Sequence, residues 1–158
     1  LNQVSTYVRL PDEAIIHPKA FEAHGLTKEF VNEHGISCEI ALMHFNEMLL
    51  ISDRQIAHNF KFDYLLTKKA EAYYFKEPFI EFTDSFCTML ALTNIIKLPG
   101  KGKMYKWPKL EEAYKHYYKQ ELVDAHDALA DCIACMKVYK AYSNNQNNLM
   151  MPVVSNVS

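Results

Sequence analysis

A short apolar strand that leads directly into a helix constrains the fold of this chain most. Residues 54–58 have the length and apolar content of a buried strand, and the next segment places Phe62, Leu65 and Leu66 at helical spacing. A strand followed at once by a helix is the unit from which open α/β sheets are built, and ligands bind such sheets beyond the carboxyl ends of their strands. The pattern therefore places Asp63, in the first turn of the helix, at the edge where ligands bind.

The rest of the chain predicts one α/β domain with a mixed sheet flanked by helices. An opening strand is predicted from Val4 to Leu10, where apolar and polar residues alternate until Pro11, and residues 79–86 are expected to be extended. Helices are predicted over residues 27–35, 37–51, 88–96 and 109–118, the first three capped by Thr27, Ser37 and Thr88, and from Asp124 or Asp127 to about Tyr142. The domain is thus expected to span residues 1–142, with residues 143–158 as a flexible tail without charged side chains.

Composition excludes several classes of protein. With 17 Lys and Arg against 19 Asp and Glu, the formal net charge is -2, which disfavours nucleic-acid binding by bulk charge but not by a local basic groove. No apolar run approaches the roughly 18–20 residues that a membrane helix needs. The charged residues near the start do not fit a secretory signal, so we expect a reducing cytoplasm as the setting of the four cysteines. Cys132 and Cys135 are expected to be small core residues.

Asp63, His126 and Asp131 have the chemistry of a catalytic site. A carboxylate at position 63 can hold Mg²⁺ or Mn²⁺, although a single Asp at this place is more often a favourable charge at a helix N-terminus. His126 precedes the last helix, and Asp131 lies one turn into it. A loop histidine with an ordinary pKa near 6.5 can take a proton from water, whereas the alternative is a surface histidine near a helix cap.

Three motifs taken in order resemble those of one enzyme family. They are H-G-L-T at residues 24–27, H-N-x-x-F-D at 58–63 and A-H-x-A-L-x-D at 125–131. Alone, the first is a turn and a helix cap whose glycine lets the backbone approach a ligand. Together the motifs are similar to those of the DEDDh 3'–5' exonucleases, ribonuclease H-like proteins that include polymerase proofreading subunits. The resemblance covers nearly all of residues 1–142.

The resemblance implies a ribonuclease H-like fold and a role for each matching residue. Asp63 and Asp131 are expected to be ligands of two divalent ions, Mg²⁺ or Mn²⁺, and His126 the general base of a two-metal hydrolysis. His24, Asn59 and Phe62 are expected to contact the substrate, although Phe62 can equally be a core residue.

The family's first motif, an Asp-x-Glu pair on the first strand, has no counterpart here. Of the acidic residues before His24, namely Asp12, Glu13 and Glu22, none is assigned that role. The chain also begins at Leu1 inside a predicted strand, so we expect a segment upstream of Leu1 that carries the first strands and the missing carboxylates. The alternative is a damaged relative that has lost them.

A basic segment between residues 97 and 119 is the candidate nucleic-acid surface. It holds seven lysines against two glutamates, with Tyr105 and Trp107 interleaved, and Lys101 and Lys103 lie in a glycine-containing loop. Lysines neutralise phosphates and aromatic rings stack on bases, which suits a single strand. The alternative is a solvated face of the protein with core tyrosines.

The expected function is metal-dependent 3'–5' hydrolysis of DNA, releasing nucleoside monophosphates in proofreading or repair. The expected partner is nucleic acid with a free 3' end, most simply single-stranded DNA. Two alternatives stay open: a catalytically silent nucleic-acid-binding module, and an RNA-processing exonuclease that shares every motif. Residues 146–151 also resemble peptides that bind sliding clamps, which would add a clamp or polymerase partner, although a low-complexity terminus explains them as well.

Overall fold

The computed structural model describes residues 3–75, 84–102, 104–123 and 127–150, and for residues 147–150 only the backbone. Within these ranges the chain forms seven helices and two strands. Their bounds in chain order are α1 Pro18–His24, α2 Lys28–His34, α3 Cys38–Leu50, β1 Gln55–Ala57, α4 Phe60–Tyr74, β2 Ser85–Cys87, α5 Thr88–Ile96, α6 Leu110–Tyr118 and α7 Ala128–Met150. None of these described helices is long and apolar enough to cross a membrane.

The opening segment is extended but does not form the strand predicted from Val4 to Leu10. It makes one isolated parallel bridge between Val8 and Ile36. Arg9 N donates to Ile36 O at 2.9 Å, and Ile36 N donates to Tyr7 O at 2.9 Å. The partner is the short connection between α2 and α3, which offers no further residues for a ladder. The strand prediction is therefore wrong for this segment, because alternation of side chains does not supply a pairing partner.

The capping residues predicted for α2 and α3 are confirmed. Thr27 Oγ1 accepts a hydrogen bond from the backbone N–H three residues later in the chain, at 3.1 Å, and Ser37 Oγ accepts the equivalent bond at 3.3 Å. Gly35 ends α2, as expected. A side chain there would collide with the backbone, because an added Cβ would lie 2.4 Å from Val31 O and 2.9 Å from Tyr7 O.

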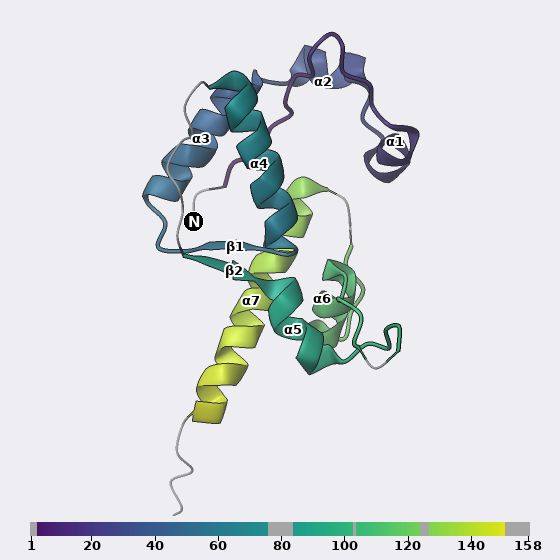
Figure 1. Cartoon of the computed structure of the whole chain (residues 1–158), viewed down its shortest axis with the longest axis vertical. Coiled ribbons are helices and arrows are strands. Elements are labelled where there is room, and N and C mark those ends of the chain that lie inside the picture. Colours follow the sequence, from purple (N-terminus) through teal and green to yellow (C-terminus); the bar gives the residue numbers. More distant parts are fainter. Residues whose placement is uncertain (1–2, 76–83, 103, 124–126, 151–158) are drawn as a thin grey trace, which may run out of the picture.

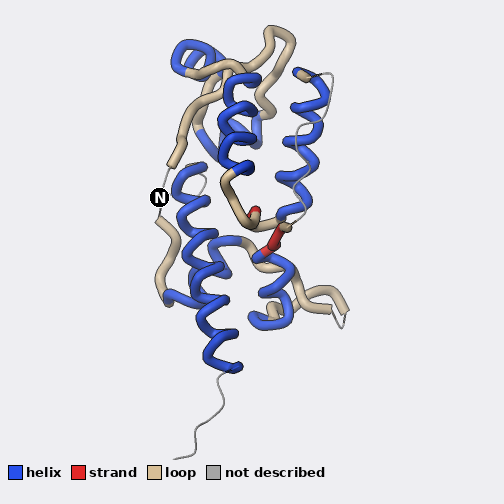
Figure 2. The backbone as a smooth tube through the Cα atoms, turned by 90° about the vertical axis from the view of Figure 1, so that its left-hand side faces the viewer, coloured by secondary structure: helices blue, strands red, loops and turns tan. Residues whose placement is uncertain are grey.

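β1 and β2 form a parallel sheet with the register Gln55–Ser85, Ile56–Phe86 and Ala57–Cys87. Figure 1 shows the strands in the middle of the molecule, with α3 and α4 on one side and α5, α6 and α7 on the other, and Figure 2 shows the same division from the side. α7 packs against β1, and α4 contacts both strands. Since the strands run in the same direction, their carboxyl ends meet at one edge, where α4 and α5 begin.

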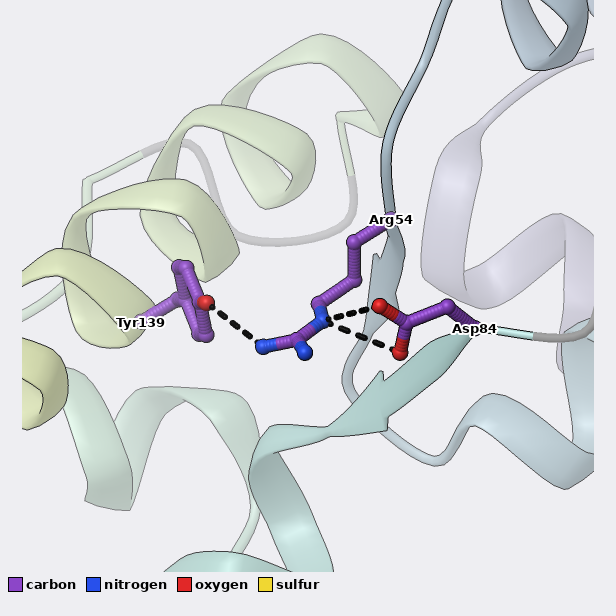
Figure 3. A network of polar contacts seen from close by, with 3 residues as sticks. All are labelled: Arg54, Asp84 and Tyr139. Carbon is purple, nitrogen blue, oxygen red and sulfur yellow. Dashed lines mark hydrogen bonds and ion pairs between the residues drawn. The ribbon is translucent and has the colours of Figure 1, made fainter.

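A polar network fixes the opposite, amino ends of the two strands (Figure 3). Arg54 precedes β1, and its Nε donates to Asp84 Oδ1 at 3.1 Å and to Asp84 Oδ2 at 3.0 Å. Arg54 Nη1 donates to the hydroxyl of Tyr139 on α7 at 3.3 Å. Gln55 N also donates to Asp84 O at 3.0 Å. These bonds connect both strands to each other and to α7 at the end of the sheet that lies away from Asp63.

The core lies between α5, α6 and α7. Leu92, Ala113 and Val138, one from each helix, are completely buried. Partly buried apolar side chains pack around them: Ile96, Leu110, Tyr114, Tyr117 and Tyr142. The apolar residues of α6 recur at helical spacing, so they form one face, and this face packs into the core.

α4 packs with the opposite face from the one that its apolar stripe suggests. Phe62, Leu65 and Leu66 are about half exposed, at 57%, 47% and 50%. The buried face carries Glu71, which is only 2% exposed and pairs with Lys68 through an Nζ–Oε2 distance of 2.9 Å. Phe62 is therefore not a core residue in the described structure.

α7 continues to Met150, beyond the end predicted near Tyr142. No Gly or Pro occurs between Ala128 and Met150 to stop the helix, although the last two turns are rich in Asn. Residues 143–150 are thus helical rather than a structureless tail, and this includes most of the peptide at 146–151 that resembles clamp ligands. Met151 and the residues after it lie outside the described ranges.

Candidate active site

The carboxyl end of β1 leads into α4 through a sharp turn at Asn59. Asn59 has φ 71° and ψ 47°, the left-handed conformation that asparagine adopts more readily than most residues. Its side chain makes no capping hydrogen bond to α4. The turn brings Asp63 into the first turn of α4, where the sequence predicts it.

The start of α7 contributes a second carboxylate. Asp131 lies in the first turn of α7, and its backbone N donates to Asp127 O at 2.9 Å. Asp127 Oδ1 accepts a hydrogen bond from Ala130 N at 2.9 Å, so Asp127 caps this helix. Negative charge in the first turn is favourable because it faces the positive end of the helix dipole.

The thiol of Cys132 responds to the charges of carboxylates on both α4 and α7. Burial raises the pKa of the Cys132 thiol, and the negative charges of Asp131, Asp63 and Asp127 raise it further. Burial above all raises the pKa of the Cys135 thiol to about 11, and Asp63 again contributes. Asp63 on α4 and Asp131 on α7 thus both contribute to the electrostatics of the Cys132 thiol, and the expected approach of the two carboxylates stays a prediction.

The two cysteines differ in their surroundings. Cys135 is buried, at 8% exposure, as the sequence predicts for a small core residue. Cys132 is exposed as a residue, which the sequence does not predict, although neighbouring atoms shield its thiol group. Cys132 is therefore the more exposed member of the pair, and both Asp131 and Asp63 raise the pKa of its thiol.

The donor chemistry of this edge fits a divalent ion. Asp63 is exposed as a residue, but the atoms around its carboxyl group exclude enough water to raise its pKa. In the described ranges neither Asp63 nor Asp131 forms an ion pair with Lys or Arg. Carboxylate oxygens that no protein cation compensates are ligands that Mg²⁺ and Mn²⁺ prefer.

The number of ligands falls short of a complete site. Among the residues that the structure describes, no three or more His, Cys, Asp or Glu side chains form a group that could hold a metal ion. Asp63 and Asp131 can thus supply two ligands, and a full coordination shell needs more.

His58 is a partly buried residue of this edge, and no local sequence pattern identifies its role. It directly follows β1, and its Nδ1 lies 2.9 Å from Thr88 Oγ1 while its Nε2 lies 2.9 Å from Pro108 O. Because a carbonyl oxygen only accepts, Nε2 carries the proton, and Nδ1 of the neutral ring accepts from the Thr88 hydroxyl. His58 therefore joins the end of β1 to the starts of α5 and α6.

The surroundings of His58 favour its neutral form. Burial lowers the pKa of the imidazole, while the Pro108 carbonyl and the charge of Asp131 oppose this effect. Thr88 is the first residue of α5 rather than its N-cap, and Cys87 occupies the cap position without a side-chain bond. The prediction that Thr88 caps the helix is wrong, because its hydroxyl faces His58 and also lies 3.3 Å from Ala57 O.

His24 lies at the end of α1, on the wall of an open cavity of about 1030 Å³. Its Nδ1 accepts a hydrogen bond from Leu26 N at 2.9 Å, and Gly25 takes the left-handed conformation with φ 68°. The opening segment, α1 and His34 form most of the cavity, and Asp127 at the start of α7 closes it. The turn of the first motif thus faces the helix that carries Asp131.

The structure describes three of the remaining five candidate site residues. Phe62 is exposed beside Asp63, and Asn59 is partly buried at the turn before α4. Lys101 is exposed in the loop between α5 and α6. His126 and Lys103 lie outside the described residues, so the structure says nothing of their positions.

Comparison with known proteins gives one match. The model of a family described as RNase_T, Exonuclease, matches residues 1–139. A search of curated proteins finds no match to this chain.

Proposed function

The chain belongs to the RNase_T exonuclease family, and on this premise we propose that it hydrolyses phosphodiester bonds at the 3' end of DNA. The reaction is metal-dependent and releases nucleoside monophosphates, as in proofreading or repair. Family membership supports a ribonuclease H-like domain, in which the two described strands belong to a larger mixed sheet.

The observation that carries this proposal is that Asp63 and Asp131 each lie in the first turn of a helix, α4 directly after β1 and α7 against β1. They come from different helices, both act on the thiol of Cys132, and no Lys or Arg of the described ranges pairs with them. These two residues would hold divalent ions of the Mg²⁺ or Mn²⁺ class. When bound, such ions stabilise the charge that develops on phosphate oxygens during hydrolysis.

His126 is the general base of the proposed reaction. This role follows from its match to the third motif of the family, five residues before Asp131 in the sequence. A neutral imidazole accepts the proton that the attacking water loses, and an ordinary histidine pKa near 6.5 keeps it neutral at physiological pH.

Five residues are proposed to contact the substrate. His24 and Phe62 are exposed, and Asn59 is partly buried at the turn before α4. Lys101 and Lys103 are assigned to the phosphates of the preceding nucleotides. A sliding clamp is a further proposed partner through residues 146–151, although binding as an extended peptide would require the last turns of α7 to unwind.

The test is the release of nucleotides from a 5'-labelled single-stranded oligonucleotide by the full chain with Mg²⁺ or Mn²⁺. His126→Ala should reduce turnover roughly 10²–10⁴-fold, the usual contribution of a general base. His44→Ala, which changes an exposed histidine of α3, is the matched control and should retain turnover. Equal rates for His126→Ala and the wild type would remove His126 from the mechanism.

A catalytically silent nucleic-acid-binding module is the second candidate, because the sequence given has no counterpart of the family's Asp-x-Glu pair. It predicts that the wild-type chain binds oligonucleotides but releases no nucleotide with either ion. An RNA-processing exonuclease is distinguished by the same assay on RNA and DNA of identical sequence, since the enzyme prefers the polymer that it processes.

A further inference from the structure

The loop between α5 and α6 forms a hairpin that projects from the molecule (Figure 1). Pro99 and Tyr105 form an antiparallel bridge, and Lys106 N donates to Leu98 O at 3.0 Å. The two sides approach so closely at Gly100 that an added Cβ would lie 2.4 Å from the backbone oxygen of Met104. The hairpin is therefore tightly packed at its base rather than a loose connection.

Two aromatic side chains lie exposed on the second side of this hairpin. Trp107 is 61% exposed and Tyr105 is 43% exposed, although large aromatic side chains usually bury most of their surface. Pro108, the next residue, is among the most buried in the chain, with less than 2% exposure. The chain thus enters the protein immediately after presenting the Trp107 ring to solvent.

The backbone on both sides of Trp107 is anchored. Lys106 Nζ pairs with Glu112 Oε1 at 2.7 Å, and Lys109 N donates to Glu112 Oε2 at 2.7 Å. Pro108 O accepts from His58 Nε2 at 2.9 Å. An exposed ring on an anchored backbone loses little conformational freedom when it meets a partner, which is the arrangement expected of a preformed contact.

Charge identifies the chemistry of that partner. Residues 97–109 contain five lysines and no acidic residue in a chain of net charge -2. The four of these lysines that the structure describes are exposed: Lys97, Lys101, Lys106 and Lys109. A partner that combines negative charge with flat apolar faces matches this surface, and unpaired nucleotides have both properties, whereas a duplex hides its base faces.

The hairpin is tied to the same end of the sheet as the candidate active site. His58, which holds Pro108, directly follows β1, and the charge of Asp131 reaches its ring. A strand whose 3' end lies at Asp63 and Asp131 can therefore pass the hairpin with its preceding nucleotides.

We propose that Trp107, with Tyr105 beside it, is a stacking platform for a base of single-stranded nucleic acid upstream of the 3' end. This inference rests on the proposed function, because it takes the 3' end to lie at the two aspartates. The lysines of residues 97–109 neutralise the phosphates on either side of the stacked base.

Trp107 is the single tryptophan of the chain, so its own emission reports on the contact. We would titrate the full chain with a thymidine oligonucleotide in the presence of EDTA, which prevents hydrolysis. Saturable quenching of the tryptophan emission is expected. The same oligonucleotide with abasic residues keeps every phosphate and should quench little.

Substitution gives the magnitude by an independent readout, the anisotropy of a labelled oligonucleotide. Trp107→Ala should weaken binding roughly 5- to 150-fold, the range that loss of one stacked base produces. Met104→Ala is the matched control, because Met104 is exposed on the same hairpin but has no aromatic face. Its affinity should stay within twofold of the wild type.

Several outcomes would overturn the platform. They are absence of quenching, equal binding by the abasic oligonucleotide, equal affinity of Trp107→Ala, or the same quenching by a blunt duplex. The measurement contains no divalent ion, so it does not depend on turnover. Failure of the proposed function would instead appear as the absence of nucleotide release by the wild-type chain with Mg²⁺ or Mn²⁺.

Discussion

Replacement of His58 by leucine tests whether the end of β1 is held by the partly buried imidazole. The ring makes two hydrogen bonds, to Thr88 Oγ1 and Pro108 O, each 2.9 Å long. Each such bond contributes about 0.5–1.5 kcal/mol, and a buried carbonyl left without a donor costs about 1–3 kcal/mol more. Thr88 retains Ala57 O at 3.3 Å as an alternative acceptor, so the main loss is at Pro108.

We therefore expect His58→Leu to lower the free energy of unfolding by about 2–4 kcal/mol at pH 7.5, measured by urea denaturation. A His58→Gln variant keeps a donor and an acceptor and should lose less than His58→Leu. A loss below about 0.5 kcal/mol for His58→Leu would refute the bridging role, because it is within the range of ordinary surface substitutions.

The pH dependence gives the same prediction a second readout. Burial lowers the pKa of His58 in the folded state, against the rise caused by the Pro108 carbonyl and Asp131. The unfolded chain then binds more protons, so stability is complete above the unfolded pKa of about 6.5 and falls as the pH drops below it. In His58→Leu and His58→Gln, the decrease in the free energy of unfolding between about pH 7.5 and 5.5 should be smaller by the contribution of His58. The other histidine with a lowered pKa, His116, remains in all three proteins and cancels in the comparison.

Two further substitutions test the packing of the fold. Lys68→Ala should lower the free energy of unfolding by about 3–5 kcal/mol, because it leaves the buried carboxylate of Glu71, only 3% exposed, without its partner. The double variant Lys68→Ala, Glu71→Leu removes that carboxylate as well and should recover most of the loss. A double variant no more stable than the single one would contradict the explanation. Gly35→Ala should lower the thermal midpoint clearly, because its Cβ would overlap the backbone at Val31 and Tyr7, and an unchanged midpoint would show that the connection moves aside freely.

The local features of the fold could be predicted from the sequence. Thr27, Ser37 and Asp127 cap their helices as expected, because a cap depends on residues three positions apart. Asp63 lies in the first turn of the helix that follows β1, as expected, and the rule that ligands bind beyond the carboxyl ends of parallel strands places it at that edge. That rule needs only the order of strands and helices.

The features that the sequence did not predict depend on contacts between residues distant in the chain. The segment at Val4–Leu10 alternates correctly but meets only the connection at Ile36. The apolar stripe of α4 is exposed because a polar pair, Lys68 and Glu71, occupies the buried face. His58 has its partners 30 and 50 residues away, and no local pattern identifies them.

The measurement that tests the central claim most directly is Mn²⁺ binding to the full chain, followed by the electron paramagnetic resonance signal of the free ion. If Asp63 and Asp131 share an ion, Asp63→Asn and Asp131→Asn should each weaken binding by more than the roughly 10–100-fold that loss of an outer-shell partner costs. Asp53→Asn, which changes an exposed aspartate before β1, should bind as the wild type does. Equal Mn²⁺ affinity in all four proteins would contradict the shared site.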